Sequence, residues 1–189
     1  MILTDYQLDC CVPLATDRAI AKYLPFFNKY FTIYEINTKE RISAFLAQIV
    51  HESGSFHYCE EIACGSNYEY REDLGNLEFE ALQAAHIVGT TTGKFYKGRG
   101  LIQITGYYNY KKCGEALGID LVHMPELLLL PEYAVQSAMW FWQTHKCNEL
   151  ADKWNFRRIT KIINGQEDGK YTHLKERIAI WEHIKEILV

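Results

Sequence analysis

The stretch that decides the fold is "FLAQIVHESGSFHYCEE", residues 45–61. Its apolar residues belong to a stripe with helical spacing, made up of Ile42, Phe45, Leu46, Ile49 and Val50. Thr38 is a suitable N-cap for this segment, and Glu40 is favourably placed in the first turn by the helix dipole. The pattern therefore predicts a core helix that starts after Thr38 and carries Glu52 near its end.

The position of Glu52 on this helix is informative. At about 100° per residue, Glu52 lies roughly 80° from Ile42, on the shoulder of the stripe, whereas His51 lies about 180° from Ile42. We therefore expect Glu52 to be half-buried. Partial desolvation disfavours the charged carboxylate, as a general acid that works near neutral pH requires. A lone glutamate near a helix end is more often an ordinary surface residue, so this role needs a second group.

Glu61, nine residues further on, is a candidate for that second group. An unbroken helix would place it on the face opposite Glu52, so the two can act together only if the helix breaks. The "SGS" at residues 53–55 predicts this break, because Gly54 readily ends a helix and serines compete for backbone hydrogen bonds. Two carboxylates, one protonated and one ionised, are the minimum for glycoside hydrolysis. By geometry alone, Glu60 is nearly as eligible as Glu61.

A metal site is the competing interpretation of the same stretch. "HESGS" is similar to the start of a zinc-protease helix, but that motif needs two histidines four residues apart. Ser55 stands at the second position, and His57 lies beyond the break. We therefore expect no metal and no other cofactor.

A second stretch, "KFYKGRGLIQITGYYNY" at residues 94–110, is rich in aromatic, amide and hydroxyl side chains. Sugars are bound by aromatic planes together with neutral hydrogen-bonding groups, so this composition is typical of a glycan groove. The "GRG" matches neither a Walker loop nor the GxGxxG fingerprint, which argues against a phosphate cradle. Half-buried core tyrosines are the alternative interpretation, and composition leaves both open.

The rest of the chain is predicted to be mainly α, because no alternating run rich in Val, Ile and Thr has the length of a strand. We expect a helix after Asp17 as N-cap, in which Pro25 starts or kinks part of the segment. Residues 59–76 and 89–106 are expected to form loops or a short hairpin. Without a linker or an internal repeat, residues 1–189 are predicted to form a single domain. Further helices are expected at 77–88, 106–117, 132–145, 155–164 and 171–188.

Composition narrows the class of protein. The chain has 189 residues, 48% of them hydrophobic, and a formal net charge of −4, so we expect a folded core and no nucleic-acid partner. The first residues lack a secretory signal and no apolar run reaches membrane-spanning length. We therefore expect a monomer made in the cytoplasm, without membrane insertion. The six cysteines contain no CxxC pair, although Cys59 and Cys64 could close a loop in an oxidising compartment.

Four separated segments give the chain a family resemblance: "AFLAQIVHESGSF", "GKFYKGRGLIQITGYYNY", "LGIDLVHMPELLLLPEYAVQSAMWFW" and "ITKIINGQEDG…HLKERIAIW". They resemble, in order, motifs of the family-19 glycoside hydrolases, especially the compact bacterial and bacteriophage members known as chitinase-like endolysins. This resemblance implies a lysozyme-like, two-lobed helical domain with a small loop or hairpin region beside its cleft. It also implies hydrolysis, with inversion, of β-1,4 bonds in N-acetylhexosamine polymers.

The resemblance also implies roles for individual residues. Glu52 matches the general acid, Glu61 the general base, and Thr105 the hydroxyl residue that helps to hold the attacking water. The segment after the second acid, "EIACGSNY", is three residues longer than the family pattern. The implied substrate-binding residues are Tyr96, Gln103, Asn109, Asn164 and Arg177.

The function expected from the resemblance is that of an endolysin, a bacteriolytic lysozyme-like glycosidase that cuts the glycan backbone of bacterial peptidoglycan. Such an enzyme would act on the cell wall in the periplasm after release or export, and its origin could be a phage, a prophage or a bacterium. The alternative is a chitinase acting on N-acetylglucosamine polymers. An inactive glycan-binding relative is disfavoured, because a pure binder needs no carboxylate pair.

Overall fold

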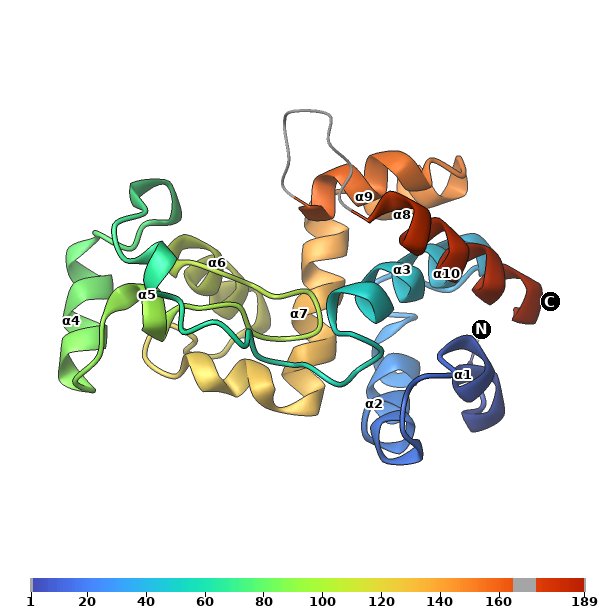
Figure 1. Cartoon of the computed structure of the whole chain (residues 1–189), viewed down its shortest axis with the longest axis horizontal. Helices are drawn as coiled ribbons and strands as arrows, with labels where there is room; N and C mark the ends of the chain where they lie inside the picture. Colours follow the sequence, from blue (N-terminus) through green and yellow to red (C-terminus); the bar gives the residue numbers. More distant parts are fainter. Residues whose placement is uncertain (1, 165–172, 189) are drawn as a thin grey trace. The chain divides into compact units, whose positions relative to one another are not determined.

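The computed structural model describes residues 2–164 and 173–188, most of which lie in helices (Figure 1). The chain divides into two compact units. The first unit consists of Met1–His57 together with Ala138–Val189, and the second of Tyr58–Ser137. The start of the helix predicted at residues 171–188 lies outside the described residues. The mainly α class expected from the sequence is confirmed.

The first unit is built around α3 (Lys39–Glu52), which packs against α10 (Leu174–Ile187), as Figure 1 shows. Every residue from 42 to 50 is buried, including the polar Ser43 and Gln48. The sequence predicted a one-sided stripe, but α3 is buried all round because other helices of the unit also pack against it. The remaining helices of this unit are α1 (Asp5–Cys11), α2 (Asp17–Tyr30), the end of α7 (Pro131–Thr144), α8 (Cys147–Asp152) and α9 (Phe156–Asn164).

Aromatic side chains fill the core of the first unit. Phe45 of α3 meets the ring of Trp142 edge-on at 5.4 Å between centroids, and Phe27 stacks on Phe31 at 5.7 Å. The N-cap of α2 is Thr16, one residue before the predicted Asp17, because the Thr16 side chain accepts a hydrogen bond from the Ala19 amide. The helix continues through Pro25.

Both ends of α3 are as predicted. The Thr38 side chain accepts from the Arg41 amide at the start. After the helix, Gly54, Ser55 and Phe56 all have positive φ values, between 55° and 67°, which turns the chain sharply. Ser53 fixes this turn, because its hydroxyl donates to the Ile49 carbonyl at 2.6 Å and accepts from the Phe56 amide at 2.9 Å. The expected break after Glu52 is therefore confirmed.

The second unit holds α4 (Phe79–Ile87), α5 (Thr92–Phe95), α6 (Tyr107–Leu117) and the start of α7. Three 3-10 turns join them: η1 (Ser66–Tyr68), η2 (Glu72–Leu74) and η3 (Pro125–Leu129). Where the sequence left loops or a short hairpin open, Arg99 forms isolated antiparallel bridges with Glu60 and with Ile104. Gly118, in the left-handed conformation, ends α6 as predicted.

All six cysteines are free thiols in the structure. The Cys59 thiol donates to the Leu128 carbonyl, and the exposed Cys64 donates to the Ser66 hydroxyl. Hydrogen bonding to Ser66 holds the pKa of Cys64 below its usual range. The possible Cys59–Cys64 bridge is therefore not formed here. Across residues 2–164 and 173–188, the helices are too short or too polar to span a membrane.

Candidate active site

Glu52 lies at the C-terminal end of α3 with its side chain 20% exposed, as half-buried as the sequence predicts. Its carboxylate accepts a hydrogen bond from the Nη2 of Arg177, on α10, at 2.5 Å. The same nitrogen donates to the Oδ1 of Asn164, at the end of α9, at 2.7 Å. Three predicted site residues that are far apart in the sequence therefore meet in the first unit.

Arg177 itself is buried, with only 3% of its surface exposed, so its guanidinium depends on partners inside the protein. The Nη1 atom donates to the Oε1 of Gln48 at 2.6 Å. Gln48 in turn donates from Nε2 to the hydroxyl of Thr160 at 2.8 Å. A chain of buried hydrogen bonds thus runs from α9 through α3 to the carboxylate of Glu52.

His51 lies beside this network rather than pointing freely into solvent. Its ring is 5.4 Å from the ring of His173. Burial, followed by the positive charge of Arg177 and by His173, lowers the pKa of His51 to about 4. His51 is therefore neutral near pH 7.

Glu61 lies in the second unit, where two neutral groups of the described residues donate to its carboxylate. The Tyr68 hydroxyl donates to Oε1 at 3.1 Å, and the Gly98 amide donates to Oε2 at 3.2 Å. The Glu61 amide donates back to the Gly98 carbonyl at 2.9 Å. Desolvation and the adjacent carboxylate of Glu61 raise the pKa of Tyr68, so its hydroxyl keeps its proton and remains a donor.

Glu60 is in a different electrostatic setting. Its Oε1 lies 3.1 Å from the Nε of Arg99 and 3.3 Å from the Nζ of Lys97. Arg99 is buried and also donates to the Phe95 carbonyl and the Tyr110 hydroxyl. Glu60 therefore serves as the counter-charge of two cations, whereas Glu61 is held by neutral donors.

Gly98 connects Glu61 to two other predicted residues, Gln103 and Thr105. A Cβ atom on Gly98 would lie 2.8 Å from the Oε1 of Gln103 and 3.3 Å from the Oγ1 of Thr105. The side-chain Nε2 of Gln103 donates to the Gly100 carbonyl at 2.9 Å, and the Thr105 hydroxyl donates to the Gln103 backbone carbonyl at 3.0 Å. The second unit therefore gathers Glu61, Gln103 and Thr105 around one glycine.

Two further predicted residues lie on α6 and at the end of α5. Asn109 is exposed on α6, and its side-chain Nδ2 donates to the Thr105 carbonyl at 2.8 Å. Tyr96 is fully buried, with its hydroxyl donating to the Val122 carbonyl at 2.8 Å. The expectation that Tyr96 contacts sugar is at odds with this burial. Its ring packs on those of Tyr107 and Tyr110, so Tyr96 belongs to the core.

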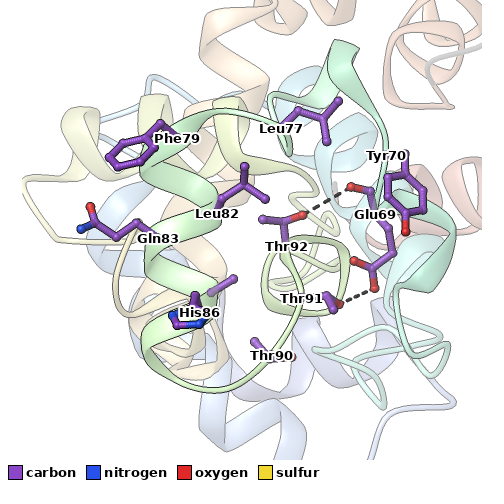
Figure 2. A pocket seen from close by; sticks show the side chains of 11 residues that line it. Glu69, Tyr70, Leu77, Phe79, Leu82, Gln83, His86, Thr90, Thr91 and Thr92 are labelled. Carbon is purple, nitrogen blue, oxygen red and sulfur yellow. Dashed lines mark hydrogen bonds between the residues drawn. The ribbon is translucent and has the colours of Figure 1, made fainter.

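A separate cavity of about 570 Å³ opens in the second unit between α4 and the Glu69–Tyr70 segment (Figure 2). Figure 2 shows Leu82 of α4 and Thr92 of α5 between these two walls. The Thr91 hydroxyl donates to the Glu69 carboxylate, and Thr92 donates to the Glu69 carbonyl. These bonds anchor the segment directly after η1, which supports the position of Tyr68 against Glu61.

The structure adds four residues to the predicted site: Gln48, Thr160, Tyr68 and Gly98. Gln48 had a signal in the sequence, because it is a polar residue within an apolar stripe, one helical turn before Glu52. Tyr68, Thr160 and Gly98 had none, since each depends on a contact between segments that are distant in the sequence.

The helical fold is also that of solved bacterial chitinases. The structure aligns with chitinase C from Streptomyces griseus at a TM-score of 0.77 and 24% identity, covering 99% of this chain and 76% of that one. A second bacterial family 19 chitinase aligns with the same TM-score and identity, over 100% of this chain and 95% of the other. The lysozyme-like helical fold expected from the sequence is therefore confirmed.

The chain belongs to glycoside hydrolase family 19, since residues 15–152 match the family model described as chitinase class I. An endochitinase of Arabidopsis thaliana is 40% identical over 130 residues, which make up 68% of this chain and 40% of that protein. Endochitinase 1 of Theobroma cacao is 32% identical over 189 residues, covering 87% of this chain and 58% of its own length. The chain thus spans about half the length of these relatives. Glu52, Glu61 and Thr105 lie inside the family match, whereas Asn164 and Arg177 lie beyond it.

Proposed function

We propose that this protein is a glycosidase that hydrolyses β-1,4 bonds of a chitin-like N-acetylhexosamine polymer with inversion. Glu52 protonates the leaving oxygen, and Glu61 takes a proton from the attacking water. Thr105 gives that water a second hydrogen-bonding partner. The observation that carries the proposal is the family match across residues 15–152, which contains all three residues.

The surroundings of Glu52 suit a group that gives up a proton. After the transfer, the carboxylate that remains is stabilised by the guanidinium of Arg177, 2.5 Å away. While Glu52 is protonated, the oxygens of Gln48 and Asn164 still accept from Arg177, so the buried cation keeps its hydrogen bonds. Both protonation states of Glu52 are therefore accommodated.

The hydrogen bonds of Glu61 favour it over Glu60 as the base. A general base must remain free to take a proton, and the donors to the Glu61 carboxylate among the described residues are neutral, the Tyr68 hydroxyl and the Gly98 backbone amide. Protonation of Glu60 would instead remove the counter-charge of Lys97 and the buried Arg99.

Chitin is the first substrate that we propose, because the similar proteins are endochitinases. Peptidoglycan, which the sequence analysis put first, has the same type of glycosidic bond and becomes the second candidate. Action on a cell wall after release from the cytoplasm remains part of this second proposal. A monomer without a cofactor is the form that we expect to act.

Digestion of the two polymers by the purified protein tests the substrate. Chitin oligomers and purified peptidoglycan are incubated separately, and the products are analysed by mass spectrometry. We expect shortened N-acetylglucosamine oligomers from chitin. Muropeptides with a reducing-end N-acetylmuramic acid, with chitin left intact, would reverse the order of the two substrates. No cleavage of either polymer would contradict a glycosidase.

The variant Glu52→Gln tests the mechanism. Glutamine keeps the shape of the side chain but cannot donate the proton, so we expect kcat/KM per folded molecule to fall by about 10²- to 10⁴-fold or more. The fold should remain intact with a lower melting temperature, because the buried Arg177 loses its counter-charge. Glu186→Gln, at an exposed position of α10 in the same unit, is the matched control and should retain full activity. A loss of less than about threefold in Glu52→Gln, under about 1 kcal/mol of barrier, would exclude Glu52 as the acid.

A further inference from the structure

Gln48 has a buried side-chain amide whose oxygen and nitrogen both form hydrogen bonds. It lies four residues before Glu52 on α3 and is 0% exposed. Its oxygen accepts from Arg177 at 2.6 Å, and its nitrogen donates to the Thr160 hydroxyl at 2.8 Å. Thr160 is also 0% exposed. These two residues are the only link between the inner nitrogen of the Arg177 guanidinium, Nη1, and α9 among the hydrogen bonds described for residues 2–164 and 173–188.

The chemistry of the partners fixes the orientation of the amide. A guanidinium has only donors, so the Gln48 oxygen must face Arg177, and its NH₂ group then needs an acceptor on the other side. The Thr160 hydroxyl supplies this acceptor. Without it, the amide could turn and bring its N–H groups against those of Arg177, which would leave a buried cation short of acceptors.

The charge of Arg177 makes this orientation relevant to Glu52. Among residues 2–164 and 173–188, Arg177 donates to one carboxylate, that of Glu52, and to two neutral oxygens, those of Gln48 and Asn164. When Glu52 carries a proton, its negative charge is lost, and of these three partners the two neutral oxygens continue to accept from the buried guanidinium. The positions of these two oxygens therefore determine where the Arg177 guanidinium lies while Glu52 is protonated.

We infer that Gln48 and Thr160 are positioning residues, which hold the Arg177 guanidinium in place while Glu52 alternates between its protonated and ionised forms. The inference rests on the proposed role of Glu52 as general acid. Neither residue touches the substrate in this mechanism. Each acts through Arg177, so a change at either one alters how Glu52 holds and releases its proton.

Among the residues that the structure describes, the other titratable groups near this network are His51, His173 and Glu176. His51 and His173 are in ring contact, and the Nδ1 of His173 lies 3.7 Å from the carboxylate of Glu176. All three stay unchanged in the variants below, so a change in the pH profile relative to wild type arises at Gln48 or Thr160.

The variant Gln48→Glu is the first test. It keeps the size and an acceptor oxygen but adds a negative charge next to Arg177. The added charge disfavours ionisation of Glu52, so the high-pH limb of the kcat/KM profile should move upward by about one pH unit. Titration of the Glu52 side-chain carboxyl carbon, followed by ¹³C NMR, should move in the same direction.

Thr160→Val is the second test, because valine keeps the shape and removes the hydroxyl that accepts from the Gln48 side chain. We expect kcat to fall on the order of 10- to 100-fold, since the misplaced Arg177 disturbs Glu52, with KM changed much less. Thr160→Ser restores a hydroxyl at the same place and should recover most of the activity.

Ser43→Ala is the matched control. Ser43 is also a buried polar residue of α3, and its hydroxyl accepts from the Nε1 of Trp181 on α10 at 3.3 Å, away from Glu52. This variant should lower the melting temperature but keep the wild-type pH profile and kcat of the folded protein. If Gln48→Glu and Thr160→Val behave in the same way, the residues are merely structural and the inference is wrong.

The design also separates this inference from the proposed function. If the wild-type protein cleaves neither polymer, the glycosidase proposal is wrong, and the NMR titration of Glu52 then decides on the positioning role alone. If Gln48→Glu does not fold, Thr160→Val with its serine rescue decides. If the wild type is active but the titration of Glu52 is the same in Gln48→Glu as in the wild type, the positioning role is wrong and the proposed glycosidase function still stands.

Discussion

Gly98 is the residue on which the arrangement around Glu61 depends. Its backbone exchanges two hydrogen bonds with Glu61, and its open Cα faces Gln103 and Thr105. In Gly98→Ala the new methyl group would lie 2.8 Å from the Gln103 Oε1, so the Gln103 side chain must move. We expect a fall in kcat/KM on the order of 10-fold or more, with little change in melting temperature, because a displaced side-chain end relaxes easily.

A double mutant checks the cause of that loss. Gln103→Ala removes the side chain that the methyl group would meet, so adding Gly98→Ala to it should cause little further loss. Such non-additivity is expected for residues in direct contact. Independent, additive effects of the two substitutions would show that Gly98 acts by another route.

His51 gives a prediction about the pH dependence of stability. Burial, Arg177 and His173 lower the pKa of His51 to about 4 in the folded protein, whereas an unfolded histidine titrates near about 6.5. Between these values the unfolded state binds more protons than the folded state, so the free energy of unfolding falls as the pH falls from about 6.5 to about 4.

The variant His51→Gln lacks this proton uptake. Its melting temperature should therefore decrease less than that of the wild type when the pH is lowered from about 6.5 to about 4. His86→Gln, at an exposed position of α4, should follow the wild type and serves as the control. Parallel melting curves for wild type and His51→Gln over this range would contradict the prediction.

At the scale of elements, the sequence predicted those helices whose signals are local. Thr38 and the Gly54 turn delimit α3, and Gly118 ends α6, because capping needs only neighbouring residues. The short helices α1, α5 and α8 were missed, since four to seven residues are too few to show a helical period.

The site was predictable only where one segment carries the signal. The sequence identified Glu52 and Glu61 as candidates, but Arg177, which donates to Glu52, comes from α10, and Asn164, which accepts from Arg177, comes from α9, both more than 100 residues from Glu52. Tyr96 was misassigned because an aromatic residue in a glycine-rich segment has the same pattern in a core as in a sugar site. Only the packing of Tyr96 against Tyr107 and Tyr110 distinguishes the two.

At the scale of the whole molecule, the two proposed carboxylates belong to different units. Glu52 belongs to the unit formed by Met1–His57 and Ala138–Val189, and Glu61 to Tyr58–Ser137. The two carboxylates are also held differently, one by a buried guanidinium and the other by a tyrosine hydroxyl and a backbone amide. This asymmetry matches the division of labour between an acid and a base.

The stereochemistry of the product tests that division of labour. A base that activates water on the face of the sugar opposite the acid inverts the anomeric configuration, whereas a nucleophilic carboxylate retains it. Because we propose that Glu61 activates water, ¹H NMR of fresh products from chitin oligomers should show the α-anomer first. Initial release of the β-anomer would contradict the water-activating role.

In the same assay Glu61→Gln should lose activity by about 10²-fold or more. Glu60→Gln, its neighbour in the sequence, should keep more activity per folded molecule and instead lose stability, since Lys97 and Arg99 lose their counter-charge. An inactive Glu60→Gln beside an active Glu61→Gln would transfer the role of base to Glu60.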